Sequence, residues 1–325
     1  MPGGRFPVSH MTPLRQQKGS ATLTAMIVMV LAAIILSSLI WQQHLSIRQL
    51  EYQRDRRQAE WLHVAATDFA RFVLAEDSRV TTNDHLGEPW AIPLADTKIA
   101  DFLRGVDIPQ EIRHVSLIGQ VSDAQSRFNL NSLVDATGQT NAPALGIFQR
   151  LLENAGIDRA LAQPVANYLS KSGFRFRDTS ELSGLQGFSE AAIRRLKPLV
   201  IALPETTAIN VNTATADILK ALFPGMSTSQ AAAFIGARLE NPLKSTVDAR
   251  NLLTRIGVAQ SGETPLIDIK SNFFMTRSEV RFGEALYVGQ SIIRRNTATS
   301  GQTPAGGTNS MTQIISTRFY STLKE

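Results

Sequence analysis

Hydrophobic residues fill one long segment near the N-terminus and then recur at helical spacing. No charged residue lies between Gly19 and Gln43, and residues 23–41 are apolar except for three hydroxyl side chains. About 20 helical residues rise about 30 Å, which is the thickness of the hydrocarbon core of a bilayer. Neither Gly nor Pro interrupts residues 20–80, and apolar positions continue at spacings of three, four or seven. The pattern predicts one continuous helix over residues 20–80, with residues 21–43 inside a membrane.

Beyond this helix the hydrophobic period changes twice. Residues 115–121 alternate as a strand does, and residues 127–130 are predicted as the returning strand. From about 141 to 256 the period is helical, with predicted N-caps at Asp178, Ser189, Asn212 or Thr213, Ser227 and Thr246. Alternation then returns over residues 274–282, 285–293 and 313–320, the first two joined by a turn at Gly283-Glu284.

This order of elements predicts an α+β fold. The simplest arrangement packs one antiparallel sheet on the long N-terminal helix and inserts an all-α domain between the strands of that sheet. The predicted divisions are residues 1–19 ahead of the helix, 20–80 as the helix, 81–140 and 266–325 as the two parts of the sheet domain, and 141–265 as the helical insertion.

Charges beside the apolar segment predict its orientation. Arg5, Arg15 and Lys18 precede it without any acidic residue, so the N-terminus should stay cytoplasmic and the remainder should face outward. Leu23 and Trp41 bound the predicted anchor, and Trp41 lies where an interfacial aromatic side chain is expected.

Two kinds of N-terminal processing compete. A secretory signal peptide has a shorter apolar region and a small-residue cleavage site after it. Here the small residues, Gly19-Ser20-Ala21, precede the apolar run, so cleavage there leaves the helix attached. The arrangement resembles the prepilin-like class, which implies cleavage between Gly19 and Ser20 by a prepilin peptidase and N-methylation of Ser20. Most members have glutamate at the fifth mature position, where this chain has Thr24.

Composition excludes several kinds of chemistry. The chain has no cysteine, which rules out disulfides and thiolate metal sites. Its histidines, at 10, 44, 63, 85 and 114, show no metal-ligand spacing, and no nucleophile elbow, phosphate loop or dinucleotide-binding motif is present. Asn129, Asn131 and Asp135 lack EF-hand spacing, so we interpret them as turn and cap residues. We therefore predict no enzyme activity, no catalytic residue, no metal site and no cofactor.

A net charge of +5 keeps nucleic acid open as a partner, and one segment bears on it. Residues 209–238 resemble a helix-hairpin-helix, in which a Gly-x-Gly hairpin brings backbone amides close to a phosphate. Gly225 is present, but Ser227 replaces the second glycine, and Lys220 and Arg238 stand without a basic cluster. A membrane-anchored DNA-binding receptor is therefore the weaker alternative function.

The chain as a whole resembles type II secretion system protein K, a minor pseudopilin. The stretches that carry the resemblance are the leader with Thr24, Arg127-Phe128-Asn129-Leu130-Asn131-Ser132-Leu133, Asp178-Thr179-Ser180-Glu181-Leu182 leading to Gly187-Phe188, and Ile209-Asn210-Val211-Asn212-Thr213-Ala214. The resemblance implies a pilin-like domain with a large helical insertion, in a single-pass inner-membrane protein whose bulk is periplasmic. It also implies a structural place at the tip of the periplasmic pseudopilus that supports protein export across the outer membrane.

The resemblance further implies partners and one possible ion. The partners are minor pseudopilins of types I and J, with type H as a further candidate, the prepilin peptidase and the inner-membrane assembly platform. Family members often carry an acidic loop in the helical domain that holds calcium. The corresponding stretch here, residues 167–177, has no acid and three basic residues, so it should not bind calcium.

The long helix is also the expected partner surface. Leu62, Ala66, Phe69 and Val73 share one face, which we expect to be buried against the protein's own sheet. The opposite face, around Arg54, Arg57 and His63, is then expected to contact the helices of other minor pseudopilins.

Overall fold

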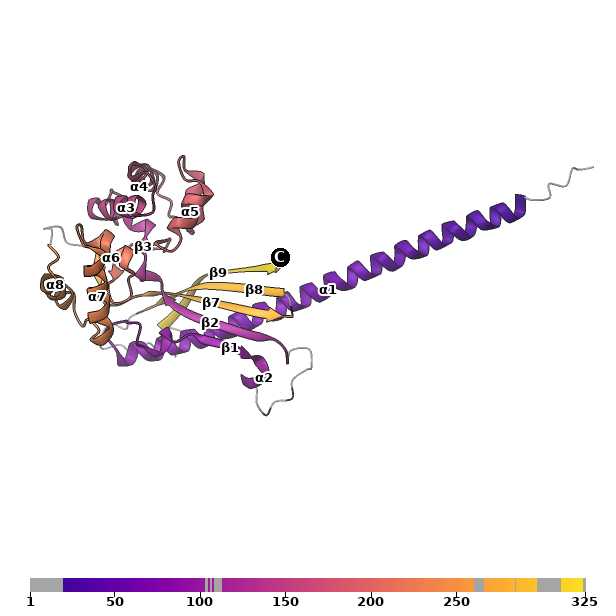
Figure 1. Ribbon diagram of the computed structural model, residues 1–325, viewed down its shortest axis with the longest axis horizontal. Helices are drawn as coiled ribbons and strands as arrows, with labels where there is room; N and C mark the ends of the chain where they lie inside the picture. Colours follow the sequence, from indigo (N-terminus) through magenta and orange to yellow (C-terminus); the bar gives the residue numbers. More distant parts are fainter. Residues whose placement is uncertain are drawn as a thin grey trace, which may run out of the picture. The chain divides into compact units, whose positions relative to one another are not determined.

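A computed structural model of the chain describes residues 20–102, 105, 107, 113–259, 266–283, 285–296 and 311–323. The chain divides into two compact units, Met1–Arg57 and Gln58–Glu325. Helix α1 (Ser20–Val80) begins in the first unit and ends in the second, which confirms the helix predicted from the sequence (Figure 1).

The first unit is described over the N-terminal part of α1. Its apolar side chains are exposed, with Leu23 and Trp41 at 64% and 68%. Within the described residues, α1 is the one helix long and apolar enough to cross a membrane. Apolar side chains that find no protein core are stable in lipid, so this segment is a membrane anchor by its physical character.

The second unit contains a five-stranded antiparallel sheet in the order β1-β2-β7-β8-β9. Its strands are β1 (Leu94–Lys98), β2 (Ser116–Asp123), β7 (Phe273–Phe282), β8 (Ala285–Arg295) and β9 (Thr312–Leu323). Of the predicted turn Gly283-Glu284, Gly283 has φ of 53° and lies between β7 and β8, whereas Glu284 lies outside the described residues. The predicted strands at 115–121, 274–282, 285–293 and 313–320 are all present. Strand β1 is polar and lies at the sheet edge, so its sequence carries no apolar alternation to predict it.

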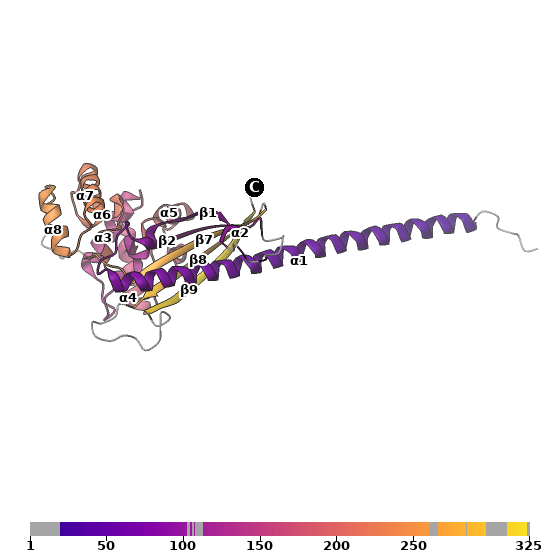
Figure 2. The same ribbon diagram turned by 90° about the horizontal axis from the view of Figure 1, so that it is seen from below.

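The second half of α1 packs across this sheet (Figure 2). Small side chains on the helix, Ala59 and Ala70, are buried against it. Ala59 belongs to an apolar cluster with Val280 and Tyr287, and Ala70 to another with Phe274. Small residues let a helix approach a sheet closely, and that closeness positions the polar contacts between α1 and the strands.

The helical insertion enters after β2 and leaves before β7, which are neighbouring strands in the sheet. It contains α3 (Ala142–Asn154), α4 (Ala162–Ser172), α5 (Glu190–Leu196), α6 (Ala216–Leu222), α7 (Thr228–Glu240) and α8 (Thr246–Arg255), with 3-10 turns at Leu130–Leu133, Arg159–Leu161 and Thr179–Gly184. One large apolar cluster joins these helices. The fold class predicted from the sequence is confirmed.

The structure corrects four details of the prediction. Residues 127–130 do not return to the main sheet, because β3 (Phe128–Asn129) instead pairs in parallel with β4 (Val200–Ile201). A second parallel pair joins β5 (Ile209–Asn210) to β6 (Ile267–Asp268), so the insertion is not purely helical. Phe128 lies in the core of the insertion, which therefore starts before residue 141. The N-caps of α6 and α8 are Thr215 and Ser245, each near the residue expected.

Candidate partner-binding surface

The second half of α1 exposes large apolar side chains on the face turned away from the sheet. Trp61 and Phe72 are 73% and 54% exposed, and they lie eleven residues apart, or about three helical turns. Phe69, beside them on the helix, is 69% exposed. Exposed aromatic side chains concentrated on one face are characteristic of surfaces that bind another protein. We call Trp61, Phe69 and Phe72 the aromatic face of α1.

A groove runs along one side of this face. It has a volume of about 470 Å³, and it is lined by α1, the segment after it, and strands β1, β2 and β7. Leu62, Phe69 and Val73 line it from the helix, while Ile92 and Leu94 line it from the other side. The groove extends the apolar character of the aromatic face toward the sheet edge.

Two residues lie on faces of α1 other than those predicted. His63 was expected on the free face, but it is 2% exposed and lies against the sheet. Its Nδ1 is 2.7 Å from the Ser278 hydroxyl and its Nε2 is 2.8 Å from the Ser291 hydroxyl. Phe69 was expected against the sheet and is exposed. The buried face runs through Ala59, His63 and Ala70, and the sequence prediction erred because it followed the largest apolar residues instead.

Burial sets the chemistry of His63. Desolvation lowers its pKa, which favours the neutral ring, and a neutral ring can donate one hydrogen bond and accept the other. Gly289 on β8 lies directly beneath it, and a Cβ at that position would be 2.3 Å from Cγ of His63. His63 is therefore a packing residue and not a partner contact.

The remaining predicted site residues are placed as follows. Arg54 and Arg57 are exposed on α1, and Arg54 pairs with Asp55 at 3.3 Å. Ser20 is the first residue of α1, whereas Gly19 lies outside the described residues. Their roles in partner binding and leader cleavage stay predictions.

In the hairpin that resembles a DNA-binding motif, the basic side chains of Lys220 and Arg238 form contacts within the protein. Arg238 is buried in α7 and donates to the backbone oxygens of Val211 and Ala214. Burial lowers its pKa to about 10, so it stays charged at neutral pH. Lys220 forms an ion pair with Asp217 at 2.8 Å. Gly225, with φ of 81°, makes the turn between α6 and α7, and the segment serves as scaffold.

The oxygen-bearing residues near Gly138 also serve the fold. Asn129 caps the turn at Leu130–Leu133, and the Asn131 amide donates to the oxygens of Phe176 and Leu203. In the basic loop at residues 167–177, Arg175 donates to the backbone oxygen of Asn131 at 2.7 Å. The Arg175 side chain therefore holds this loop against the core of the insertion.

Sequence reasoning missed a buried polar network where the insertion joins the sheet. Asp123, at the end of β2, accepts hydrogen bonds from Asn210, Thr213 and Ser271 through Oδ2. Burial raises the pKa of its carboxyl to about 6, and the hydrogen bonds from Thr213 and Ser271 oppose that rise. Asn210 lies in Ile209-Asn210-Val211-Asn212-Thr213-Ala214, one of the stretches that carry the family resemblance. That resemblance was the sequence feature that could have pointed to the network.

Comparison with known proteins places these features in a family. A sequence of type II secretion system protein K from Pseudomonas aeruginosa is 30% identical over 315 residues, covering 86% of this chain and 90% of the relative. The chain belongs to the type II secretion system protein K family. Two family models, both described as type II secretion system protein K, match residues 126–173 and 209–270. The protein K of Klebsiella pneumoniae is 27% identical and covers 88% of this chain and 95% of the relative.

A solved structure supports the fold. The GspK-GspI-GspJ complex of the type 2 secretion system of enterotoxigenic Escherichia coli contains a chain with a TM-score of 0.56 and 22% identity, covering 84% of this chain and 99% of that one. Family membership confirms the function inferred from the sequence, a minor pseudopilin of type II secretion. It gives no support to the DNA-binding alternative.

Proposed function

We propose that this protein K caps the tip of a periplasmic pseudopilus as a structural subunit without enzyme activity. Residues 21–43 anchor it in the bacterial inner membrane, with the N-terminus in the cytoplasm and the second unit in the periplasm. The apolar, exposed first half of α1 and the basic residues ahead of it support this orientation.

The aromatic face of α1 is the observation that carries the proposal. In water, three large aromatic side chains on one helix face lower solubility and add nothing to the fold's own core. A second helix laid along Trp61, Phe69 and Phe72 would remove that surface from water. Other minor pseudopilins offer such a helix, and the related Escherichia coli chain was solved in complex with two of them. Types I and J are therefore the proposed partners, with type H as a further candidate.

Tip position also accounts for Thr24. Its hydroxyl donates to the backbone oxygen of Ala21, at 3.0 Å, and it has no charge to offer a neighbouring subunit. In the pilin class, glutamate at this place is thought to neutralise the N-terminal amine of the neighbouring subunit. A subunit at the tip has no neighbour above it, so a neutral residue is sufficient there. The helical insertion adds bulk that suits a cap better than a shaft.

Co-purification tests the partner surface. The variant Trp61→Ala/Phe72→Ala should lose the partner pseudopilins when the full chain is co-expressed with them and purified in detergent. Both residues are exposed, so the melting temperature should stay within about 2 °C of wild type. Leu239→Ala is the matched control, because Leu239 is 59% exposed on α7 of the insertion. Retention of the partners by the double variant would contradict the proposal.

Leader processing is proposed to follow the prepilin pattern. Prepilin peptidase should cut between Gly19 and Ser20, leaving α1 attached and Ser20 as an N-methylated first residue. Mass spectrometry of the mature N-terminus measures this directly. A mature chain that starts after Trp41 would show instead that the apolar segment is a removed signal peptide.

A further inference from the structure

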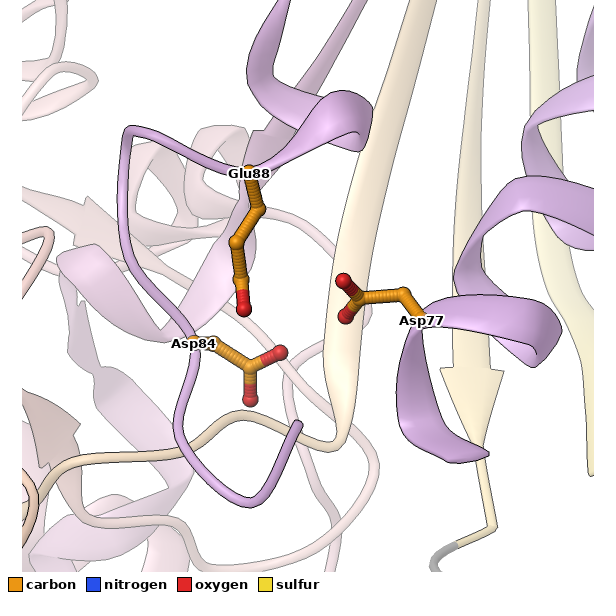
Figure 3. Close-up of side chains that lie close together, drawn as sticks. All are labelled: Asp77, Asp84 and Glu88. Atoms are coloured by element: carbon orange, nitrogen blue, oxygen red, sulfur yellow. The ribbon is translucent and has the colours of Figure 1, made fainter. Parts of the chain in front are cut away.

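Three carboxylates converge near the end of α1 (Figure 3). Asp77 lies in the last turns of the helix, and Asp84 and Glu88 come from the segment that follows it. One oxygen of each lies within 4.8 Å of the others, and all three residues are buried. The segment is held there because the amide of Asp84 donates to the oxygen of Ile269 at 2.9 Å.

An arginine side chain reaches this cluster. Arg295, on β8, donates to Oδ2 of Asp77 at 3.1 Å and to Oδ2 of Asp84 at 2.6 Å. The guanidinium also lies over the ring of Phe274, 4.7 Å from its centre. Three carboxylates and one guanidinium leave two negative charges unbalanced, and unbalanced buried charge is costly.

The hydrogen bonding of Glu88 gives evidence for a ligand that is independent of the clustering of carboxylates. Its Oε2 accepts from the Trp90 indole at 2.7 Å and from the His85 amide at 3.0 Å. Its Oε1 is buried and has no hydrogen-bond partner in the described part of the chain. The His85 ring nitrogen Nε2 is 3.8 Å from Oε1, which exceeds hydrogen-bonding distance. The Glu88 side chain points into the space between Asp77 and Asp84 (Figure 3).

We propose that Asp77, Asp84 and Glu88 bind one divalent cation, and that calcium fits best. A divalent ion supplies the two missing positive charges and a partner for Oε1 of Glu88. Calcium binds oxygen at 2.3–2.6 Å, so ligands on opposite sides of it are about 4.6–5.2 Å apart, which spans the observed spread. Magnesium holds opposite ligands only about 4.0–4.2 Å apart and demands stricter geometry. Calcium takes six to eight oxygen ligands, so water would have to supply the remaining ones.

The ion would act on the junction between α1, the sheet and the insertion. Ser271, just before β7, donates its amide to Oδ2 of Asp84 and its hydroxyl to Asp123. Asn210 of the insertion donates to the backbone oxygen of Asp84 at 3.1 Å. Fixing Asp84 therefore fixes both ends of the insertion against the end of α1. The site is separate from the basic loop at residues 167–177.

Protons are the competing way to balance the charge. Burial, with help from Glu88, raises the pKa of Asp77 to about 6, and burial also raises the pKa of Asp84 against the pull of Arg295. Protonation of Asp77 would remove one of the two unbalanced negative charges without an ion.

Calorimetry on the full chain in detergent tests the site. After treatment with EDTA and removal of the chelator, calcium chloride should bind with one ion per chain at pH 7.5 and raise the melting temperature by several degrees. Glu88→Gln should weaken calcium binding at least tenfold. The amide keeps the volume of Glu88 and can donate into the cluster, so the ion-free variant should melt at or above ion-free wild type.

A matched control is Glu76→Gln, which neutralises the exposed neighbour of Asp77 that pairs with Arg79 at 3.0 Å. It should bind calcium as wild type does. Two results would overturn the proposal. In one, wild type shows no heat of binding and the same melting temperature with calcium as with EDTA. In the other, Glu88→Gln binds calcium as tightly as Glu76→Gln, which places the ion elsewhere.

Discussion

The helical insertion and the sheet domain are held together by different kinds of interior. The insertion has one large apolar cluster, in which Phe128 stacks on Phe148 with ring centres 5.7 Å apart. In its described residues the sheet domain has two small apolar clusters, and buried polar groups lie among them, such as His63 between two hydroxyls. Stability in the insertion therefore depends strongly on side-chain volume, beside buried hydrogen bonds such as those of Asn131 and Arg238. In the sheet domain it depends on particular hydrogen bonds and close contacts.

This difference matters because the two regions have different proposed tasks. The sheet domain must hold the second half of α1 at a fixed rotation, since that rotation decides which face meets partner subunits. The paired hydrogen bonds of His63 allow one rotation, whereas an apolar contact tolerates several. The insertion has only to remain bulky and folded.

The largest predicted effect is loss of volume in the insertion. Phe148→Ala should destabilise the protein by about 3–5 kcal/mol, because the side chain is fully buried and its removal leaves a cavity. Urea denaturation of the full chain in detergent, followed by tryptophan fluorescence, measures the change. Phe174→Ala is the control, since Phe174 is 71% exposed and should change stability by less than about 0.5 kcal/mol.

The next largest effect is predicted for the close contact between His63 on α1 and Gly289 on β8. Gly289→Ala should cost about 1–3 kcal/mol, because the added methyl would overlap the His63 ring, which is pinned by both nitrogens. Gly236→Ala, in α7 with open space around it, should be neutral or slightly stabilising. In a His63→Ala background the cost of Gly289→Ala should fall by more than half. An unchanged cost would show that the contact with His63 is not its cause.

A smaller effect comes from pH. The pKa of His63 is lowered by burial, so below about pH 6.5 the unfolded chain takes up a proton that the folded chain resists. This group's contribution to stability is present above pH 6.5 and is lost as the pH falls. Asp123 has the opposite sign, because its folded carboxyl, with a pKa of about 6, holds a proton that the unfolded chain releases.

Comparison of wild type with His63→Gln isolates the histidine. Any stability advantage of wild type measured at pH 7.5 should shrink at pH 5, because Gln does not titrate and Asp123 is common to both chains. Urea midpoints at the two pH values give the result. A difference in midpoint that stays constant with pH would mean that folding does not shift the pKa of His63.

The smallest stability effect is predicted for the exposed arginines of α1. Arg54→Glu with Arg57→Glu should change the free energy of unfolding by less than about 0.5 kcal/mol, because both side chains are exposed. Co-purification of the minor pseudopilins and secretion should nevertheless fall. If both survive the reversal, these two residues do not contact a partner.

Much of the fold could be predicted because hydrophobic period reports directly on helices and strands. The long helix, four strands of the main sheet and the helical character of the insertion all follow from it. The rotation of α1 could not be predicted from this period. The buried face of α1 contains small residues such as Ala59 and a polar residue, His63, whose hydroxyl partners lie more than 200 positions away in the sequence. The cluster of Asp77, Asp84 and Glu88 could not be predicted either. Arg295, which pairs with Asp77 and Asp84, lies on a strand more than 200 positions away in the sequence.

Site-specific photo-crosslinking tests the central claim most directly. A photoreactive amino acid replaces Phe72 on the aromatic face of α1, or Leu239 on α7 as the control, in cells that express the other minor pseudopilins. We expect position 72 to yield an adduct with a type I or type J pseudopilin and position 239 to yield none. Absence of an adduct at position 72, together with one at position 239, would contradict it and move the partner surface to the insertion.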